Sequence, residues 1–248
     1  MVDLRDDKIE LNEVNWWSNW ANVEWSTKNS YVILSDEFDE PFFNRGGFVT
    51  PEDAGAVGRM ESAFRRKGRE PYILLQKLRN YSEVEKTLDG YEVVDSMSVM
   101  ELRTPSFKRN SEVRVEVIDD DKVHDWCEAY LFAFYGENKL MTPVERIVRR
   151  IVRGKGATLL LARYRGSAAG TTAFFSKGGL SGAYCVGTRP EFRNHGIATM
   201  LLESVYSDSK NEGNKVVLQT MISDQAEDFY RKLGFARVYL KQLFKKTS

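Results

Sequence analysis

The sequence lacks the features that mark a secreted, membrane-embedded or nucleic-acid-binding chain. Its 248 residues include only two cysteines, Cys127 and Cys185, which is too few for a disulfide framework. No apolar run approaches the length of a membrane span. The 36 basic and 36 acidic side chains cancel, so no overall positive field would attract nucleic acid. Residues 1–5 open a polar, acidic stretch without signal-peptide character, and we expect a cytoplasmic protein.

Histidine is also scarce, which bears on metal chemistry. His195 has no second ligand nearby and His124 is the only other histidine, so we expect no metal site. What the chain does contain is a core: 42 % of its residues are hydrophobic and 12 % are aromatic. A chain of this length and composition can form one or two folded domains.

The most informative segment is residues 188–200. It follows an apolar strand, Gly182–Gly187, and leads into an amphipathic helix that begins near Gly196. The segment contains Arg-x-x-Gly-x-Ala, with arginine at position 193 and alanine at position 198. The first N–H groups of a helix have no intrahelical acceptor, and the helix dipole adds partial positive charge there. Glycine lets an anion approach the backbone closely, so the segment predicts a phosphate-binding loop.

Two further segments follow this loop in a defined order. An apolar strand, Lys215–Met221, comes after the helix, and Ala226–Phe235 reads Ala-Glu-Asp-Phe-Tyr-Arg-Lys-Leu-Gly-Phe. The loop, the strand and this last segment together resemble the acyl-CoA signature of the GNAT N-acetyltransferases. The resemblance extends from Thr158 to Val238 and is specific because three ordered elements agree.

The resemblance implies a fold and an activity. The fold is α/β with a mixed sheet, the GNAT acyl-CoA N-acyltransferase fold. The activity is transfer of the acetyl group of acetyl-CoA to a primary amine of a small molecule or peptide, without a metal. The cofactor-binding residues that it implies come from one strand end, the loop and a turn: Val186, Gly187, Thr188, Arg193, Asn194, His195, Gly196, Ile197, Ala198 and Ser223.

Chemical roles follow from the same resemblance. Tyr230 matches the family tyrosine, and a phenol can protonate the departing thiolate as general acid. A backbone N–H near Thr188 is placed to stabilise the oxyanion. Ser223 stands where the family often has asparagine, so its hydroxyl offers less than the paired donor and acceptor of an amide. Cys185 has no histidine partner in view and is typical of a small buried hydrophobe, which favours direct transfer in a ternary complex.

The general base stays open. Glu128, Glu137 and Glu191 are available carboxylates, and a chain of water molecules is the alternative. Arginines 149, 150 and 153 on a predicted helix are expected to form a solvated face, with contact to an acidic substrate or to CoA phosphates as the other reading.

The first half of the chain echoes the second. Phe48–Glu52 resembles Gly187–Glu191, and Val84–Tyr91 resembles the Tyr230–Phe235 segment. Asp53–Gly58 takes the place of the phosphate loop but offers an acidic residue, which would repel a pyrophosphate. We therefore predict a degenerate GNAT-like domain at residues 1–105 and a catalytic domain at residues 111–248, joined through the polar segment 103–110.

Four of the five tryptophans lie between positions 16 and 25. Trp16, Trp17 and Trp20 share one face at helical spacing, which predicts a hydrophobic clasp between the halves or within the first. An aromatic wall of the acceptor pocket is the functional alternative.

Three other functions compete with the acetyltransferase. The first is a non-catalytic acyl-CoA-binding sensor or regulatory module, which would not need Tyr230. The second is transfer of a longer acyl group or from aminoacyl-tRNA, although the zero net charge disfavours tRNA. The third is a nucleotide-phosphate binder, which the absence of Gly-x-x-x-x-Gly-Lys-Ser/Thr disfavours. The sequence leaves the acceptor and the oligomeric state open.

Overall fold

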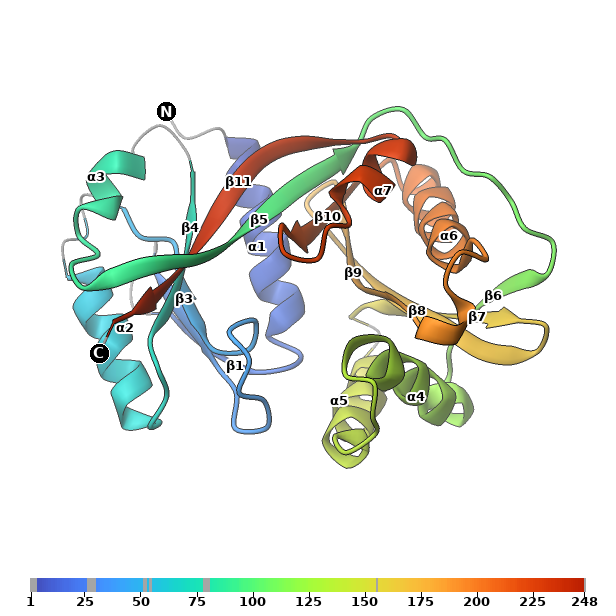
Figure 1. Cartoon of the computed structure of the whole chain (residues 1–248), viewed down its shortest axis with the longest axis horizontal. Helices are drawn as coiled ribbons and strands as arrows, with labels where there is room; N and C mark the ends of the chain where they lie inside the picture. Colours follow the sequence, from blue (N-terminus) through green and yellow to red (C-terminus); the bar gives the residue numbers. More distant parts are fainter. Residues whose placement is uncertain are drawn as a thin grey trace. The chain divides into compact units, whose positions relative to one another are not determined.

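The computed structural model describes residues 4–25, 30–50, 53, 55–77, 81–154 and 156–247. Within them the chain forms two compact units that are not contiguous in sequence. The first unit comprises residues 1–100, 219–229 and 237–248, and the second comprises residues 101–218 and 230–236. Each unit is a layered α/β structure (Figure 1).

The second unit contains the segments that the sequence marks as functional. Its strands are hydrogen-bonded in the order β10-β9-β8-β7-β6. The strand and helix bounds in chain order are β6 Val113–Val117, α4 Val123–Phe134, α5 Met141–Gly154, β7 Thr158–Tyr164, β8 Ser167–Lys177, β9 Leu180–Thr188, α6 Ile197–Asn211, β10 Lys215–Met221 and α7 Glu227–Lys232. Short 3-10 turns, Asp120–Lys122 and Pro190–Phe192, precede α4 and α6. Strands β6 to β9 are antiparallel neighbours, whereas β9 and β10 run parallel.

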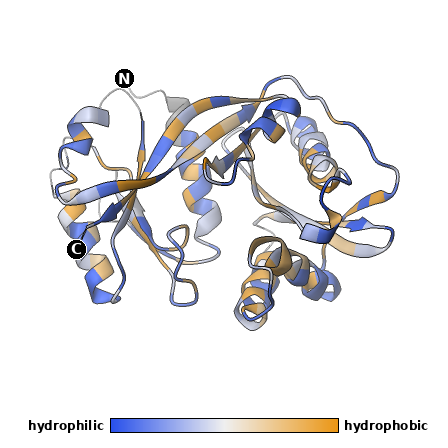
Figure 2. Cartoon of the chain, viewed as in Figure 1, coloured by the Kyte–Doolittle hydropathy of each residue, from blue (hydrophilic) through white to orange (hydrophobic). Residues whose placement is uncertain are grey.

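Helix α6 covers one face of this sheet, and α4 with α5 cover the other (Figure 1). Two glycines allow the close approach. A Cβ on Gly170 would stand 2.7 Å from the Cγ2 of Ile197 in α6, and a Cβ on Gly187 would stand 2.6 Å from the ring of Phe134 in α4. Helix α4 is coloured mostly apolar, whereas α5 alternates between apolar and polar residues (Figure 2). The apolar stripe of α5 is buried through Val144, Ile147, Val148 and Ile151.

The first unit contains the remaining strands and helices of the described residues. Its strands are ordered β1-β2-β3-β4-β11-β5. The bounds in chain order are α1 Leu4–Trp17, β1 Asn22–Trp25, β2 Tyr31–Leu34, β3 Arg45–Gly47, α2 Ala56–Arg66, β4 Tyr72–Gln76, α3 Tyr81–Glu85, β5 Tyr91–Leu102 and β11 Phe235–Lys246. Strand β5 ends in the second unit, and strand β11 begins there.

Alternation along β4 divides the core of the first unit between two faces. Ile73 and Leu75 belong to a cluster with the buried face of α2, whereas Leu74 packs with Leu243 of β11 and with Met97. The last strand of the chain is antiparallel to β4, with Lys241 opposite Gln76. Residues from the C-terminal end of the sequence therefore complete the core of the N-terminal unit.

A charged cluster is buried in the first unit. Glu13, Arg45 and Lys241 are at most 1 % exposed, and Glu10 is 3 % exposed. The Arg45 guanidinium donates to Glu13 at 2.7 Å, and the Lys241 ammonium pairs with both Glu10, at 2.8 Å, and Glu13. Burial opposes ionisation of Glu13, but the two cations outweigh it and lower the pKa of that carboxyl. Burial raises the pKa of the second acid, Glu10, although its pairing with Lys241 opposes that rise.

Most predicted elements form as expected. The sequence pattern predicts a helix over Ala56–Arg66 and strands over Tyr72–Gln76 and Lys215–Met221, and all three form with these bounds. The pair Gly178-Gly179 is a hairpin signal, and it joins β8 to β9 with positive φ at both residues. Pro51 and Glu52 of the predicted repeat lie outside the described residues.

Two local predictions are wrong. The run Thr142-Pro143-Val144-Glu145 predicts a helix capped by Thr142, but α5 begins at Met141, because its backbone hydrogen bonds already include Val144 N to Leu140 O. Trp20 lies in the turn after α1 and not on the helix.

The tryptophan clasp forms inside the first unit even so. The rings of Trp16, Trp17 and Trp20 lie 6.2–6.4 Å apart between centroids. The rings of Trp17 and Trp20 also contact that of Phe43. The three tryptophans are buried together, so they are part of the core of this unit.

Candidate active site

The loop between β9 and α6 adopts a left-handed backbone at two of three successive residues. Asn194 has φ 66° and Gly196 has φ 74°. The first backbone bond of α6 runs from Met200 N to Gly196 O at 3.0 Å. The N–H groups that open the helix, those of Ile197 and Ala198 among them, therefore have no intrahelical acceptor. The structure places the predicted phosphate-binding residues 193–198 at a helix N-terminus with the geometry that favours an anion.

The side chains of this loop divide between solvent and core. Arg193, Asn194 and His195 are exposed, and Ile197 is 1 % exposed. The His195 imidazole stacks on the ring of Tyr164, with centroids 4.6 Å apart. The loop is therefore anchored to the sheet through Ile197 and through this stack, while its backbone faces outward.

Strand β9 is irregular just before the loop. Thr171 of β8 is opposite Gly187, but Ala173 is opposite Tyr184, so β9 carries an extra residue. Cys185, within this β-bulge, has φ 52°. Its carbonyl accepts a hydrogen bond from the Thr171 hydroxyl at 3.1 Å. A bulge takes backbone groups out of the regular ladder, and here it lies next to the predicted cofactor contacts that begin at Val186.

The registered pairing of β9 with β10 stops before the end of β9. Registered parallel pairing extends from Leu180 opposite Lys215 to Ala183 opposite Leu218. Val186, Gly187 and Thr188 follow this paired stretch. Sequence reasoning missed the bulge, because a cysteine carries no signal for a left-handed conformation.

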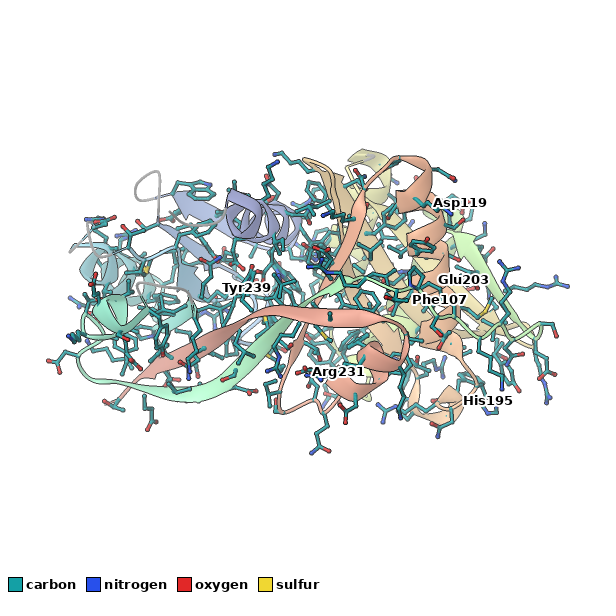
Figure 3. The ribbon with its side chains drawn as sticks, turned by 90° about the horizontal axis from the view of Figure 1, so that it is seen from above. Phe107, Asp119, His195, Glu203, Arg231 and Tyr239 are labelled. Carbon is teal, nitrogen blue, oxygen red and sulfur yellow. The ribbon has the colours of Figure 1, made fainter. Side chains whose placement is uncertain are left out.

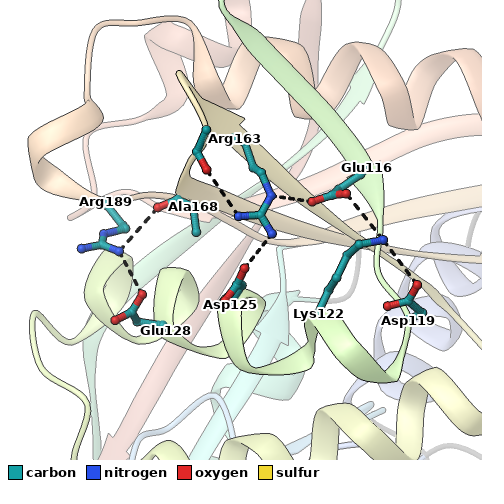
Figure 4. A network of polar contacts seen from close by, with 9 residues as sticks. Glu116, Asp119, Lys122, Asp125, Glu128, Arg163, Ala168 and Arg189 are labelled. Carbon is teal, nitrogen blue, oxygen red and sulfur yellow. Dashed lines mark hydrogen bonds and ion pairs between the residues drawn. The ribbon is translucent and has the colours of Figure 1, made fainter.

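Arg189 fixes the point where β9 ends and the loop begins. Its backbone N–H donates to Ala169 O at 2.9 Å, and its guanidinium pairs with Glu128 of α4 at 3.3 Å (Figure 4). The same guanidinium lies over the rings of Phe132 and Phe192. A neighbouring network joins α4 to the sheet: the Arg163 guanidinium donates to Glu116 and to Asp125 at 2.6 Å each. Both networks hold α4 against the strands that carry the candidate site.

The three carboxylates named as candidate bases all have cationic partners. Glu128 and Glu191 both pair with Arg189, and Glu137 pairs with Lys139 at 2.7 Å. No geometry here singles out one of them, so the base remains unassigned.

Tyr230 lies in α7 and is 7 % exposed. Its ring meets that of Phe235 edge-on, with centroids 6.0 Å apart. The following turn is held by Gly234, where φ is 97° and a Cβ would stand 1.8 Å from the carbonyl oxygen of Thr104. The sequence Tyr-x-x-x-Gly-Phe thus positions a mostly buried phenol within the second unit.

Ser223 and Cys185 have local environments of their own. Ser223 belongs to the first unit and donates to Asp95 at 2.5 Å, so its contact with a cofactor stays a prediction. Burial raises the pKa of the half-buried Cys185 thiol well above its usual range. A protonated thiol is a poor nucleophile.

The loop at the corresponding place in the first unit is different. Asp53, in front of α2, forms an ion pair with Arg59 and accepts a hydrogen bond from the Ser30 hydroxyl at 3.3 Å. Strands β3 and β4 flank α2 and are parallel, as β9 and β10 are around α6. The two units therefore share a strand–loop–helix–strand arrangement with different loop chemistry.

Within the described residues, no cluster of three or more histidine, cysteine, aspartate or glutamate side chains has the spacing to hold a metal ion. In the same residues, no helix is both long and apolar enough to span a membrane.

Comparison with known proteins agrees with this geometry. Residues 155–237 match the model of the GNAT acetyltransferase domain. A GCN5-related N-acetyltransferase from Kribbella flavida has a similar structure, with a TM-score of 0.71 and 15 % identity over 97 % of this chain and 95 % of that one. A GNAT-family acetyltransferase from Colwellia psychrerythraea has a TM-score of 0.59 and 10 % identity, over 100 % of this chain and 98 % of that one. A tandem GNAT protein from the clavulanic acid biosynthesis pathway has a TM-score of 0.61 and 13 % identity, over 87 % of this chain and 77 % of that one. A search of curated proteins gave no match.

Residues 155–237 thus carry the match to the GNAT acetyltransferase domain, and this match supports acyl transfer from an acyl-CoA donor in general. The solved structures share the α/β fold of this chain over nearly its whole length, including the residues before that domain.

Proposed function

We propose that this protein transfers the acetyl group of acetyl-CoA to a primary amine of a small molecule or peptide. The observation that carries the proposal is the loop at residues 193–198, where two left-handed residues leave the first N–H groups of α6 available to a pyrophosphate. The residues proposed to bind the cofactor are these six together with the β9 backbone at 186–188. Ser223 is a further proposed contact.

The acetyl group would react at the end of β9. The bulge at Cys185 and the residues after it offer backbone N–H groups that can stabilise the oxyanion of a tetrahedral intermediate. Tyr230 is the proposed general acid, which returns a proton to the thiolate of CoA as it leaves. The amine attacks the thioester directly in this proposal, because the raised pKa of the half-buried Cys185 thiol makes it poorly suited to carry the acetyl group.

The first unit is proposed to be a degenerate relative of the second that does not bind CoA. Support comes from its shared strand–loop–helix–strand arrangement and from the Asp53 carboxylate in front of α2. A carboxylate at that position repels a pyrophosphate. Its contribution to the protein is then structural, or it shapes the access of the acceptor.

Calorimetry with acetyl-CoA tests the proposal. The wild type should bind with a dissociation constant in the micromolar range, and Gly196→Glu should abolish binding. Glutamate disfavours φ near 74° and adds a negative charge where the pyrophosphate is proposed to lie. Gly213→Glu is the matched control, since Gly213 has φ 73° at the other end of α6. A folded wild type that does not bind acetyl-CoA would contradict the proposal.

The sensor alternative predicts the same binding without turnover. A screen of primary amines with the acetyl-CoA-binding wild type separates the two functions. Release of CoA that depends on an amine supports the transferase, and binding without turnover on any amine favours the sensor.

A further inference from the structure

The irregular segment between β5 and β6 lies along α6 within the second unit. The Thr104 N–H donates to Gly234 O at 3.2 Å, and the Phe107 ring lies 5.8 Å from that of Tyr206 in α6. Arg109 pairs with Glu203, one turn nearer the start of α6, at 2.7 Å. Figure 3 shows Phe107 and Glu203 close to each other, with His195 beyond the start of the helix. We call residues 103–110 the strap.

The strap ends on the phosphate-binding loop. The Asn110 side-chain amide donates to the backbone carbonyl of His195 at 2.9 Å. Its side-chain oxygen accepts from the Glu112 N–H at 3.0 Å, and its backbone N–H points at the sulfur of Met200 at 3.4 Å. The Asn110 Cβ also stands within van der Waals distance of the place that a Cβ on Gly196 would take. A single residue thus contacts both the loop, through its side chain, and the first turn of α6, through its backbone N–H.

The accepting carbonyl occupies a sensitive position. His195 lies between Asn194 and Gly196, the two residues with positive φ. A left-handed conformation costs energy at a residue other than glycine, so this backbone needs support from its surroundings. The His195 ring is held from the other side by its stack on Tyr164. The carbonyl held by Asn110 and the ring held by Tyr164 together restrict the peptide planes on both sides of His195.

We propose that Asn110 is a positioning residue for acyl-CoA binding. By fixing the His195 carbonyl, it keeps the neighbouring N–H groups turned toward the pyrophosphate before the ligand arrives. Preorganisation of this kind raises affinity by reducing the ordering cost of binding. This inference rests on the proposed function, and it adds a residue that lies outside residues 155–237 in the sequence.

The test compares Asn110→Ala with Ser111→Ala in calorimetry. The two changes are adjacent and uncharged, and Ser111 is exposed. The probes are acetyl-CoA and adenosine 3′-phosphate 5′-diphosphate, the nucleotide half of CoA. Loss of the Asn110 hydrogen bond should weaken both ligands by the same factor, about five- to tenfold, since both carry the pyrophosphate. Ser111→Ala should change either affinity less than about twofold, since it leaves that hydrogen bond in place.

Asn110→Ser is a second test variant, for use if Asn110→Ala does not fold. Its hydroxyl can still accept from the Glu112 N–H in the same kind of turn, but it is too short to reach His195. Unchanged affinities in either folded variant would overturn the inference, and so would a loss confined to acetyl-CoA. A wild type that binds neither ligand would instead contradict the proposed function, which keeps the two failures distinct.

Discussion

At the scale of single residues, the site separates a residue suited to proton transfer from one that is not. Tyr230 presents a mostly buried phenol at the place where the family has its tyrosine. Cys185 occupies a strained position in β9, but burial keeps its thiol protonated. These environments favour an acid role for the tyrosine and argue against a covalent acyl-cysteine.

Replacing Tyr230 by phenylalanine should lower kcat by about 100-fold, the low end of the range for a lost general acid. The KM for acetyl-CoA should change little, because only one hydroxyl is removed. The measurement is steady-state kinetics with an amine found in the screen, and Tyr206→Phe on α6 is the control. A kcat within a factor of three of the wild type would show that the phenol is not the acid.

Thiol titration tests the cysteine environments. Burial raises the pKa values of both Cys127 and Cys185, so a rise from pH 7 to pH 9 should leave them mostly protonated in the folded protein. A disulfide reagent should therefore react slowly across this range and rapidly with both thiols after urea unfolding. Cys185→Ser should keep kcat within about threefold, since thiol attack is not part of the proposed route. Fast reaction of Cys185 in the folded wild type would reopen the covalent route.

At the scale of elements, the site depends on how closely two helices approach β9. Gly187 allows α4 to reach β9, and Gly170 of the neighbouring strand β8 allows Ile197 of α6 to approach the sheet from the other face. The anchoring of Arg189 to Glu128 then ties the start of the phosphate loop to α4. The packing of the two helices therefore holds the bulge and the loop in place together.

Gly187→Ala should destabilise the protein by about 1–3 kcal/mol, the usual cost of overpacking. The new methyl would meet the Phe134 ring at 2.6 Å and the Ala133 side chain at 2.9 Å. Chemical denaturation measures the change in the free energy of unfolding. Combining the change with Phe134→Ala should recover part of the loss, and no recovery would mean that the helix contact is not the cause.

At the scale of the whole molecule, each unit contains segments that lie far apart in the sequence. Residues 237–248 belong to the first unit, where β11 is antiparallel to β4 and Lys241 joins the buried cluster with Glu10 and Glu13. The predicted division at residues 1–105 and 111–248 remains a prediction about folding units. The structure adds that the core of the first unit includes side chains from the end of the chain.

Lys241→Met should destabilise the protein by about 3–5 kcal/mol, because it removes the cation that Glu10 and Glu13 share and leaves Arg45 to pair with Glu13 alone. Lys245→Met, four residues further along β11, removes an exposed ion pair with Glu70 and should cost at most about 1 kcal/mol. Urea denaturation of the two variants gives the comparison. Equal small losses would show that the buried cluster contributes little beyond the strand pairing.

Local structure was largely predictable. Helix α2, strands β4 and β10 and the start of α6 were predicted at or near their observed bounds, because periodicity and glycine placement act over a few residues. The bulge at Cys185 and the contact of Asn110 with His195 were not predicted. A cysteine does not signal positive φ, and an asparagine 85 positions away in the sequence does not announce its partner.

The sequence by itself determined the resemblance to the GNAT acetyltransferase domain, the bounds of β10 and the start of α6 near Gly196, since each depends on neighbouring residues in a fixed order. Only the tertiary structure decided that β11 pairs with β4, that four charges are buried together and that the strap ends on the loop. These features join residues far apart along the chain, and the free energy of such contacts depends on geometry that local pattern does not encode.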